Sequence, residues 1–385
     1  MRITGQRRSG LAAALGILMA GALVLTGCAQ GGASDDGDSA SGNGDAAAVL
    51  DLANEKVEEY SAFEQVFPEI EPFTPVGTGK VDVVTFGSGA DVLYLNGQRT
   101  VDAFTEVGWD VRGPLDGEFS PVVTGGLIDA AVAEGRDAMV FMAGNLQDMP
   151  QAVTNALDSG MILVCVMCPY FQDLADQGVI YAGVDMEVQG EILAWYLIQQ
   201  SEAVGRLMSL EDPGSYSTVM RADGFDRVVS ENCDTCELLD RVVQPSADIG
   251  LPGPPQWSAF LNATPAGDTR LYVNSMADVV GLRMAKTLQS IGRTDVFIGG
   301  FDADGEAVDM IRQGDTPFVA TVALPFYWGD WAGVDLTMRA FSGVDLWESS
   351  DLPMQLVNLD NVEDFTEFTP AGDWQAEFKQ AWGMS

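Results

Sequence analysis

The sequence predicts an α/β fold with two similar lobes, each built on a parallel sheet. Short, dense apolar runs end in aspartate at residues 294–302 (T-D-V-F-I-G-G-F-D) and 179–185 (V-I-Y-A-G-V-D). Such runs are typical of strands buried on both faces of a parallel sheet. From Lys80 onward, strand and helix patterns alternate, as they do in parallel α/β structure. At 385 residues the chain is long enough for two lobes. We therefore expect two Rossmann-like lobes that face each other across a cleft, with a hinge that the chain crosses three times.

The N-terminus predicts a cleaved targeting segment. Residues 1–27 combine a basic start with an apolar run at 11–25, and L-T-G-C ends at Cys28. Small residues followed by cysteine resemble the bacterial lipobox, in which that cysteine is acylated and begins the mature chain. A membrane-spanning helix is the alternative, but an apolar run of about 15 residues is short for a span that needs roughly 20. Residues 28–48, rich in Gly, Ser and Asp, then predict a flexible acidic linker.

The next segment, 49–78, predicts a helix followed by a proline-rich collar. Apolar residues recur at helical spacing through 48–60. Pro68, Pro72 and Pro75 then favour an extended chain. We expect this segment to pack on the first lobe.

The first lobe is predicted to comprise 79–185 and 325–354. Its strands are the short apolar runs bounded by polar or glycine residues, and its helices are the longer segments between them. The expected strands are 81–86, 109–112, 138–143, 161–167 and 179–183, and the expected helices are 95–107, 121–134, 149–157 and 327–341.

The second lobe is predicted to comprise 186–324 and 355–365, followed by a C-terminal tail at 366–385. We expect Asp185 and Leu324 at the hinge, where the chain passes between the lobes. The same alternation continues here. The expected strands are 206–210, 238–243, 270–274, 296–300, 318–322 and 354–359, and the expected helices are 188–203, 218–230, 257–261, 277–291 and 305–312.

The composition excludes several classes of function. The chain has no histidine, so Ser-His-Asp and Cys-His catalysis and histidine metal sites are ruled out. Without residues 1–27, 16 of the 19 basic residues remain against 57 acidic ones. This charge opposes binding to nucleic acid and to anionic lipid surfaces. We expect no nucleic-acid partner, no metal and no cofactor.

The cysteines predict two local disulfides. Once Cys28 carries lipid, the other four form two C-x-x-C pairs, Cys165 with Cys168 and Cys233 with Cys236, in a chain exported to an oxidising compartment. A zinc site with four cysteine ligands is the alternative. However, the first pair ends a strand near the cleft, whereas the second precedes a strand and belongs at the opposite edge. Neither pair has the surroundings of a thioredoxin-like redox motif.

Four short motifs occur in a recognisable order. They are A-L-D-S-G-M-I-L-V at 156–164, R-A-D-G-F at 221–225, V-F-I-G-G-F-D ending at Asp302, and F-V-A-T-V at 318–322. Together they resemble the ribose-binding group of type I periplasmic (solute) binding proteins, over roughly residues 79–365. The resemblance implies a receptor that delivers small solutes, most often sugars, to an ABC-type importer. Sugar-binding members usually carry D-R where this chain has Met167 and Cys168, and N-D where it has Ser275 and Met276, so the resemblance does not extend to those sugar-binding residues.

Candidate binding residues follow from the strand ends, because ligands bind at the carboxyl edge of parallel strands. Arg221 offers a planar fork of five donors, or forms a surface salt bridge. Asp302 accepts two donors from a ligand, or caps the helix near Gly305. Phe301 offers an apolar face to the ligand or fills the core. The other candidates lie on loops after strands, where plain turn chemistry is the alternative: Asp91, Tyr94, Asn145, Tyr170 and Ser275.

Together the patterns predict a lipid-anchored, extracytoplasmic solute-binding protein, and not an enzyme. We expect a monomer that closes its lobes on a small polar, sugar-like solute and is recognised by the membrane subunits of an ABC-type importer, with contact to the membrane through lipid only. A ligand-sensing lipoprotein that signals to a receptor is the first alternative. A carboxylate-based glycoside hydrolase is the second, although the chain contains no G-x-S-x-G, Walker or zincin motif.

Overall fold

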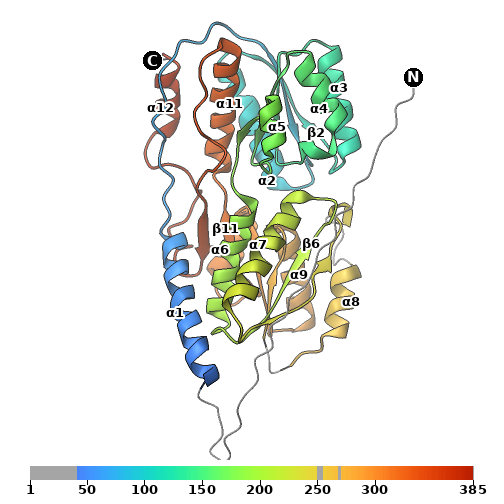
Figure 1. Ribbon diagram of the computed structural model, residues 1–385, viewed down its shortest axis with the longest axis vertical. Coiled ribbons are helices and arrows are strands. Elements are labelled where there is room, and N and C mark those ends of the chain that lie inside the picture. The colour runs from blue at the N-terminus through green and yellow to red at the C-terminus, as the bar shows by residue number, and fades with distance from the viewer. Residues whose placement is uncertain (1–40, 249–254, 268–269, 385) are drawn as a thin grey trace, which may run out of the picture. The chain divides into compact units, whose positions relative to one another are not determined.

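The computed structural model describes residues 41–248, 255–267 and 270–384 (Figure 1). The predicted lipidation site, Cys28, and the predicted signal peptide lie outside these residues. No helix in the described ranges is long and apolar enough to span a membrane. The fold is α/β, with two lobes that each contain one main sheet.

The first lobe is organised on a five-stranded parallel sheet in the order β2-β1-β3-β4-β5. Alternate residues of its strands point to opposite faces, so Val140 packs toward α2 and α11, while Phe141 packs toward α3 and α4. The strands are β1 (Lys80–Thr85), β2 (Asp110–Asp116), β3 (Ala138–Met142), β4 (Ile162–Val166) and β5 (Ile180–Ala182). The helices are α2 (Asp91–Glu106), α3 (Pro121–Ala133), η1 (Leu146–Asp148), α4 (Pro150–Asp158), α5 (Gln172–Gln177) and α11 (Phe326–Ser342).

The second lobe is organised on a seven-stranded sheet in the order β12-β11-β10-β9-β6-β7, with β8 also paired to β6. Its strands are parallel except β12, which runs antiparallel to β11 at the edge. Helices α6 and α7 cover one face, and α9 and α10 cover the other. The strands are β6 (Arg206–Glu211), β7 (Glu237–Leu238), β8 (Val242–Val243), β9 (Leu271–Asn274), β10 (Val296–Phe301), β11 (Phe318–Ala323) and β12 (Gln355–Asn358). The helices are α6 (Met186–Gln200), α7 (Tyr216–Asn232), η2 (Ser246–Asp248), α8 (Pro255–Ala263), α9 (Asp278–Ile291) and α10 (Gly305–Gln313).

One expected strand is absent, because the predicted run 238–243 forms two short strands, β7 and β8. The chain between them carries Arg241, whose guanidinium pairs with Glu211, Asp223 and Asp226. A side chain that binds three carboxylates from β6 and α7 does not fit the apolar environment expected of a central strand. The strand pairing with β6 is therefore interrupted around Arg241.

The N-terminal helix corrects a second expectation. Helix α1 (Ser41–Ser61) packs on α6 and β12 of the second lobe (Figure 1), not on the first. The carbonyl of Ser61 accepts a hydrogen bond from Gln355 at 3.0 Å. The proline-rich segment that follows does contact the first lobe, where the amide of Phe73 donates to the carbonyl of Ala381 at 2.8 Å. The N-terminal segment therefore touches both lobes.

The C-terminal tail contains a helix that the sequence pattern did not predict, α12 (Trp374–Ala381). It packs on α11 through large aromatic rings, with Trp382 stacked on Trp331 at 5.5 Å between ring centroids. The signal was present as aromatic residues at positions 374, 378 and 382, which is the i, i+4, i+8 spacing of one helix face.

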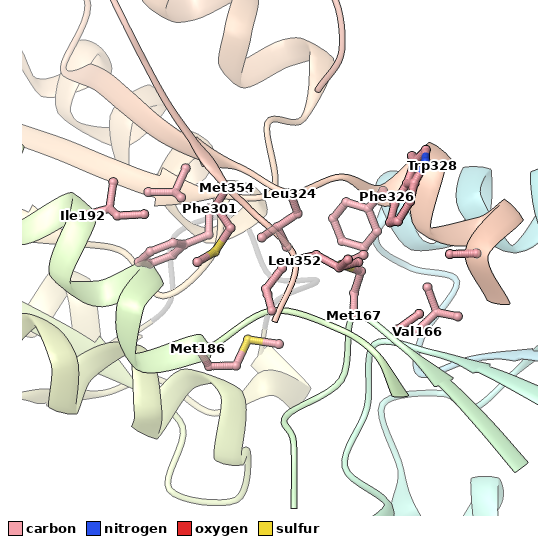
Figure 2. Packing of buried hydrophobic residues seen from close by; sticks show 14 of the residues in the cluster. Val166, Met167, Met186, Ile192, Phe301, Leu324, Phe326, Trp328, Leu352 and Met354 are labelled. Atoms are coloured by element: carbon pink, nitrogen blue, oxygen red, sulfur yellow. The ribbon is translucent and has the colours of Figure 1, made fainter. Parts of the chain in front are cut away.

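Three chain segments connect the lobes, at 183–185, 324–325 and 349–354. The first and third are hydrogen-bonded, because the amide of Leu352 donates to the carbonyl of Gly183 and the amide of Gly183 donates to the carbonyl of Ser349, both at 2.8 Å. Figure 2 shows Leu324, Leu352 and Met354 packed among buried residues of both lobes. The crossings thus share one apolar cluster.

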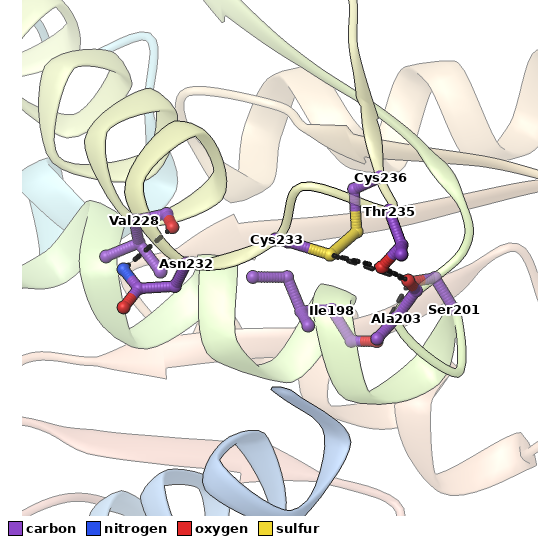
Figure 3. The surroundings of a disulfide bond; sticks show 8 residues. All are labelled: Ile198, Ser201, Ala203, Val228, Asn232, Cys233, Thr235 and Cys236. Carbon is purple, nitrogen blue, oxygen red and sulfur yellow. Dashed lines mark hydrogen bonds between the residues drawn. A yellow bond between two sulfur atoms is a disulfide. The ribbon is translucent and has the colours of Figure 1, made fainter. Parts of the chain in front are cut away.

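Both C-x-x-C pairs form disulfides, Cys165–Cys168 and Cys233–Cys236. In the first, Cys165 lies in β4 and Cys168 follows the strand at the carboxyl edge. The second precedes β7 at the opposite edge, where the hydroxyl of Thr235 donates to the carbonyl of Ala203 (Figure 3). This is the separation that argues against a shared zinc site.

Candidate functional site

A cavity of about 100 Å³ lies between the carboxyl ends of the two sheets. The first lobe contributes the residues that follow β1, β3 and β4, and the second contributes those that follow β6, β9 and β10. Most of the wall is apolar, with polar groups at a few points. The wall includes Phe86, Phe119, Asn145, Met167, Arg221, Met276, Asp302, Asp304 and Phe326.

The cavity continues into a wider side groove of about 820 Å³ along α2, α9 and the start of α10. Asp302, Asp304 and Phe326 line both spaces. Ligand pockets commonly enclose roughly 300–1,000 Å³, so the cavity alone is small and the two spaces together are ample. A small solute can therefore enter through the groove.

Backbone conformation directs several of these residues into the cavity. Ala143, Met167, Met276 and Asp302 each follow directly on a strand or within two residues of its end, and each has a positive φ, between 47° and 104°. This region is costly for residues other than glycine and clusters at functional sites. Four strand ends thus share a positive φ at the cavity wall, which is the pattern expected of a functional site.

Arg221 lies in the second turn of α7 and is 6% exposed. A Cβ on Gly190 or Gly224 would meet backbone of the facing helix at about 2 Å, so these glycines let α6 and α7 touch and bring Gln189 beside Arg221. The guanidinium donates to Gln189, to the carbonyl of Met276 at 2.8 Å and to Asp302 at 3.1 Å. Arg221 is therefore a fixed cleft donor and not a surface salt bridge.

Asp302 and Phe301 have different roles. The Asp302 carboxylate lines the cavity and pairs with Arg221; burial raises its pKa, and the Arg221 charge opposes that rise. It does not cap α10, because the N-cap position is Asp304. Phe301 is fully buried and lies beneath the Arg221 guanidinium, at 4.6 Å from its ring centroid. It supports the site from the core instead of facing the cavity.

Asn145 lines the first-lobe side of the cavity and is 5% exposed. Its carbonyl oxygen accepts from the amide of Gln147 at 3.3 Å, which begins η1. Its amide nitrogen is buried and has no hydrogen-bond partner among the described residues. A buried donor without a partner is costly, and the described residues leave this one unused.

The remaining candidates are dispersed. Asp91 and Tyr94 are exposed on α2 and line the side groove but not the cavity. Tyr170 donates to Gln172 at 3.1 Å and packs edge-on against Tyr181. Ser275 is fully buried and donates to the carbonyl of Gly299 at 2.8 Å. Neither Tyr170 nor Ser275 lines the cavity.

The two hinge candidates lie at the crossings. Asp185 caps α6 by accepting from the amide of Glu187 at 2.8 Å, and Leu324 is buried between β11 and α11, where it lines both spaces.

Sequence reasoning missed several wall residues. Phe86 and Phe119 meet edge-to-face at 5.6 Å beside the cavity, and Met167 projects from the chain between the two cysteines of the first disulfide. Asp304 was also missed, although the motif D-A-D after β10 placed it two residues beyond a residue that was chosen. Burial, followed by the negative charges of Asp302, Asp91 and Glu306, raises the pKa of Asp304 to about 7.

The chemistry of the site is that of binding. In the described part of the chain, no three His, Cys, Asp or Glu side chains are placed to hold a metal ion. The site offers amide and guanidinium donors, carboxylate acceptors and aromatic faces to a small guest. This set fixes orientation by hydrogen bonds inside a mainly apolar wall, as is usual for small-molecule sites.

Comparison with known proteins agrees with the fold. Residues 103–343 match a family model described as periplasmic binding protein domain, and no curated protein matches the chain. A sugar ABC transporter structure from Yersinia enterocolitica is 14% identical, with a TM-score of 0.69 over 82% of this chain and 99% of that one. A solute-binding protein from Bacillus halodurans with bound myo-inositol is 18% identical, with a TM-score of 0.64 over 75% and 97%.

A third structure, a solute-binding protein from Mycobacterium smegmatis with bound glycerol, is 18% identical, with a TM-score of 0.65 over 77% of this chain and 100% of that one. At such identities the structures show a shared fold. The family model, however, covers well over half of the sequence. The chain therefore belongs to the periplasmic binding protein family.

Proposed function

We propose that this protein is the solute-binding component of an ABC-type importer and that it binds a small polar, sugar-like solute in the cleft. The observation that carries the proposal is the buried amide nitrogen of Asn145, which has no partner among the described residues, in a cavity wall to which Arg221 and Asp302 also belong. Sugars and polyols are the ligands named for several structures of the same fold, among them myo-inositol, D-allose and glycerol.

The expected mechanism follows from the three crossings. A solute that binds one lobe of an open form completes its hydrogen bonds when the other lobe closes over it. Closure excludes water, so the bonds from Asn145 on one side and Arg221 on the other strengthen together. The importer would recognise the closed state, and no covalent bond changes. The apolar cluster at the crossings, with Leu324 and Leu352, can stay packed while the backbone rotates about it.

We also propose that lipid on Cys28 holds the protein at the outer face of the membrane, on the evidence of L-T-G-C after an apolar run. Mass spectrometry of the protein expressed in a bacterial host should show a diacylglyceryl group on Cys28, and C28S should be released into the soluble fraction. An unmodified Cys28 would contradict the anchoring.

Thermal shift and calorimetry on the full chain in mild detergent test the binding function, with allitol, myo-inositol, D-allose, D-tagatose and glycerol as probes. A ligand at 100 times its Kd stabilises the folded state by about 2.7 kcal/mol. We expect R221A to weaken binding at least tenfold, because a hydrogen bond from a charged donor contributes roughly 1.5–3 kcal/mol.

The matched control is R227A on the same helix, whose guanidinium is 42% exposed and pairs with Glu187 and Glu191 on α6. It should leave affinity unchanged. Binding that R221A and R227A affect equally would place the ligand outside the cleft.

A further inference from the structure

Asp304 is a cleft carboxylate without a counterion. It lines both the cavity and the side groove. Although it stands at the N-cap of α10, its side chain accepts no capping hydrogen bond. Among the described residues no arginine or lysine pairs with it, and every neighbouring charge that acts on it is negative. A partly buried carboxylate in a cavity wall is normally paired with a positive charge, and Asp304 has no such partner among the described residues.

The nearby cations are already engaged. Arg221 pairs with Asp302, and Lys286 at the groove edge pairs with Glu306 at 2.6 Å. Arg99, also in the groove wall, pairs with Glu367, and Arg283 of α9 in the same wall is not free either. The charges that face Asp304 from the neighbouring elements are Asp91 on α2, Asp302 after β10, Glu306 on α10 and Asp278 on α9. Asp278 is fully buried and accepts from Thr321 and from the amide of Asp304.

Hydrogen-bond donors lie on both sides of the cavity, on Asn145 of the first lobe and on Arg221 of the second. Besides the free amide of Asn145, the Arg221 guanidinium uses one hydrogen on each of its nitrogens in bonds to Gln189, Met276 and Asp302. One hydrogen on each terminal nitrogen is thus left for a ligand. These groups suit hydroxyl oxygens. A ligand carboxylate would be repelled, because the positive charge of Arg221 is already balanced by Asp302 and further carboxylates stand nearby.

We propose that the solute is a small organic cation, namely a polyol or sugar skeleton carrying one ammonium group. The ammonium group would lie on Asp304, its oxygen atoms would accept from Asn145 and Arg221, and its carbon face would lie against Phe86 and Phe326. The proposal rests on the proposed function, because it names the ligand class of the same cleft. A bare metal ion is disfavoured, since the described residues place no three metal-ligating groups together.

Matched probe pairs separate the ammonium group from the skeleton: glycerol with 3-amino-1,2-propanediol, and D-glucitol with 1-amino-1-deoxy-D-glucitol. Calorimetry on the full chain at pH 8, where Asp304 is ionised, should show the amine binding at least tenfold more tightly than its neutral partner in one or both pairs. D304N should abolish that preference, so that the amine and its neutral partner bind the variant with similar affinity. D309N is the control, because Asp309 is on the same helix, is 70% exposed and pairs with Arg312; it should keep the preference.

The possible outcomes distinguish the two proposals. Neutral members that bind as tightly as the amines, or amines that bind D304N as they bind the unchanged protein, would overturn the ammonium assignment and leave the proposed function standing. L-serine that binds more tightly than 3-amino-1,2-propanediol, or Mg²⁺ or Ca²⁺ that binds through Asp304, would overturn it in favour of a zwitterion or a metal. If neither these pairs nor the wider polyol series bind, both proposals fail.

Discussion

The substitution D335N tests what fastens the proline-rich segment and the C-terminal tail to the first lobe. Asp335 is fully buried on α11 and accepts three hydrogen bonds at 2.7 Å, from Arg339, Trp347 and Trp382. Arg339, only 2% exposed, also donates to the carbonyl of Glu71 at 2.6 Å and lies over Phe73 at 4.5 Å. One carboxylate thus joins α11, the tail that follows α12, and the proline-rich segment.

The expected cost of D335N follows from these contacts. Asparagine has nearly the same volume, but it leaves the buried Arg339 charge without a counterion, and its amide group faces donors. Removing one partner of a buried ion pair costs about 3–5 kcal/mol. For a cooperative unit of 150–250 residues, each kcal/mol lowers Tm by about 2–4 °C. We therefore expect Tm to fall by roughly 6–20 °C, in differential scanning calorimetry and in tryptophan fluorescence.

The matched control is D345N, which makes the same chemical change at an exposed residue three positions after α11. It should alter stability by no more than about 0.5 kcal/mol. Limited proteolysis should also cut the 62–79 segment of D335N faster, because Glu71 and Phe73 lose the fixed guanidinium on which they rest. A Tm for D335N within 2 °C of the unchanged protein would refute the reasoning that the Asp335–Arg339 ion pair holds the proline-rich segment and the C-terminal tail on α11.

Two further predictions concern the cleft. The double variants C165S/C168S and C233S/C236S remove disulfides of equal sequence separation, so each should lower the free energy of unfolding by about 2 kcal/mol through loop entropy. Only C165S/C168S should weaken ligand binding in calorimetry, because Met167 and Pro169 of the cavity wall adjoin that disulfide. Equal effects of the two variants on binding would contradict this. The pKa of Asp304 is raised from 3.8 to about 7 in the folded state, so the folded state binds more protons and the contribution of this group to stability falls as pH rises from about 4 to about 7; D304N should therefore raise Tm at pH 8 and change it little at pH 4, and a gain that does not depend on pH would show that the carboxylate is not the cause.

The sequence predicted the scaffold well because strand periodicity and parallel topology leave strong local signals. The runs 294–302 and 179–185 became β10 and β5 with their following turns, and the predicted strand 161–167 became β4. The misses have other causes. Helix α1 has an apolar stripe that predicts burial but does not identify the surface that it covers. In the structure Ala53 and Val57 are buried, and α1 packs on α6 and β12 of the second lobe. Helix α12 was missed because its burial depends on tryptophans, which are recognised as a cluster only when α11 is placed beside them.

The cavity wall was harder to predict than the scaffold, for a reason that lies in the backbone. Periodicity ends where a strand ends, and the direction of the next side chain then depends on a single φ angle. Glycine would have marked left-handed positions in the sequence, but the chain uses Ala143, Met167, Met276 and Asp302 there. Ser275, which also follows a strand but has no positive φ, bonds to the sheet edge instead. Four residues of the cavity wall are therefore placed by an unfavourable φ that the fold tolerates, and tertiary contacts stabilise it, such as the bond from Arg221 to the carbonyl of Met276.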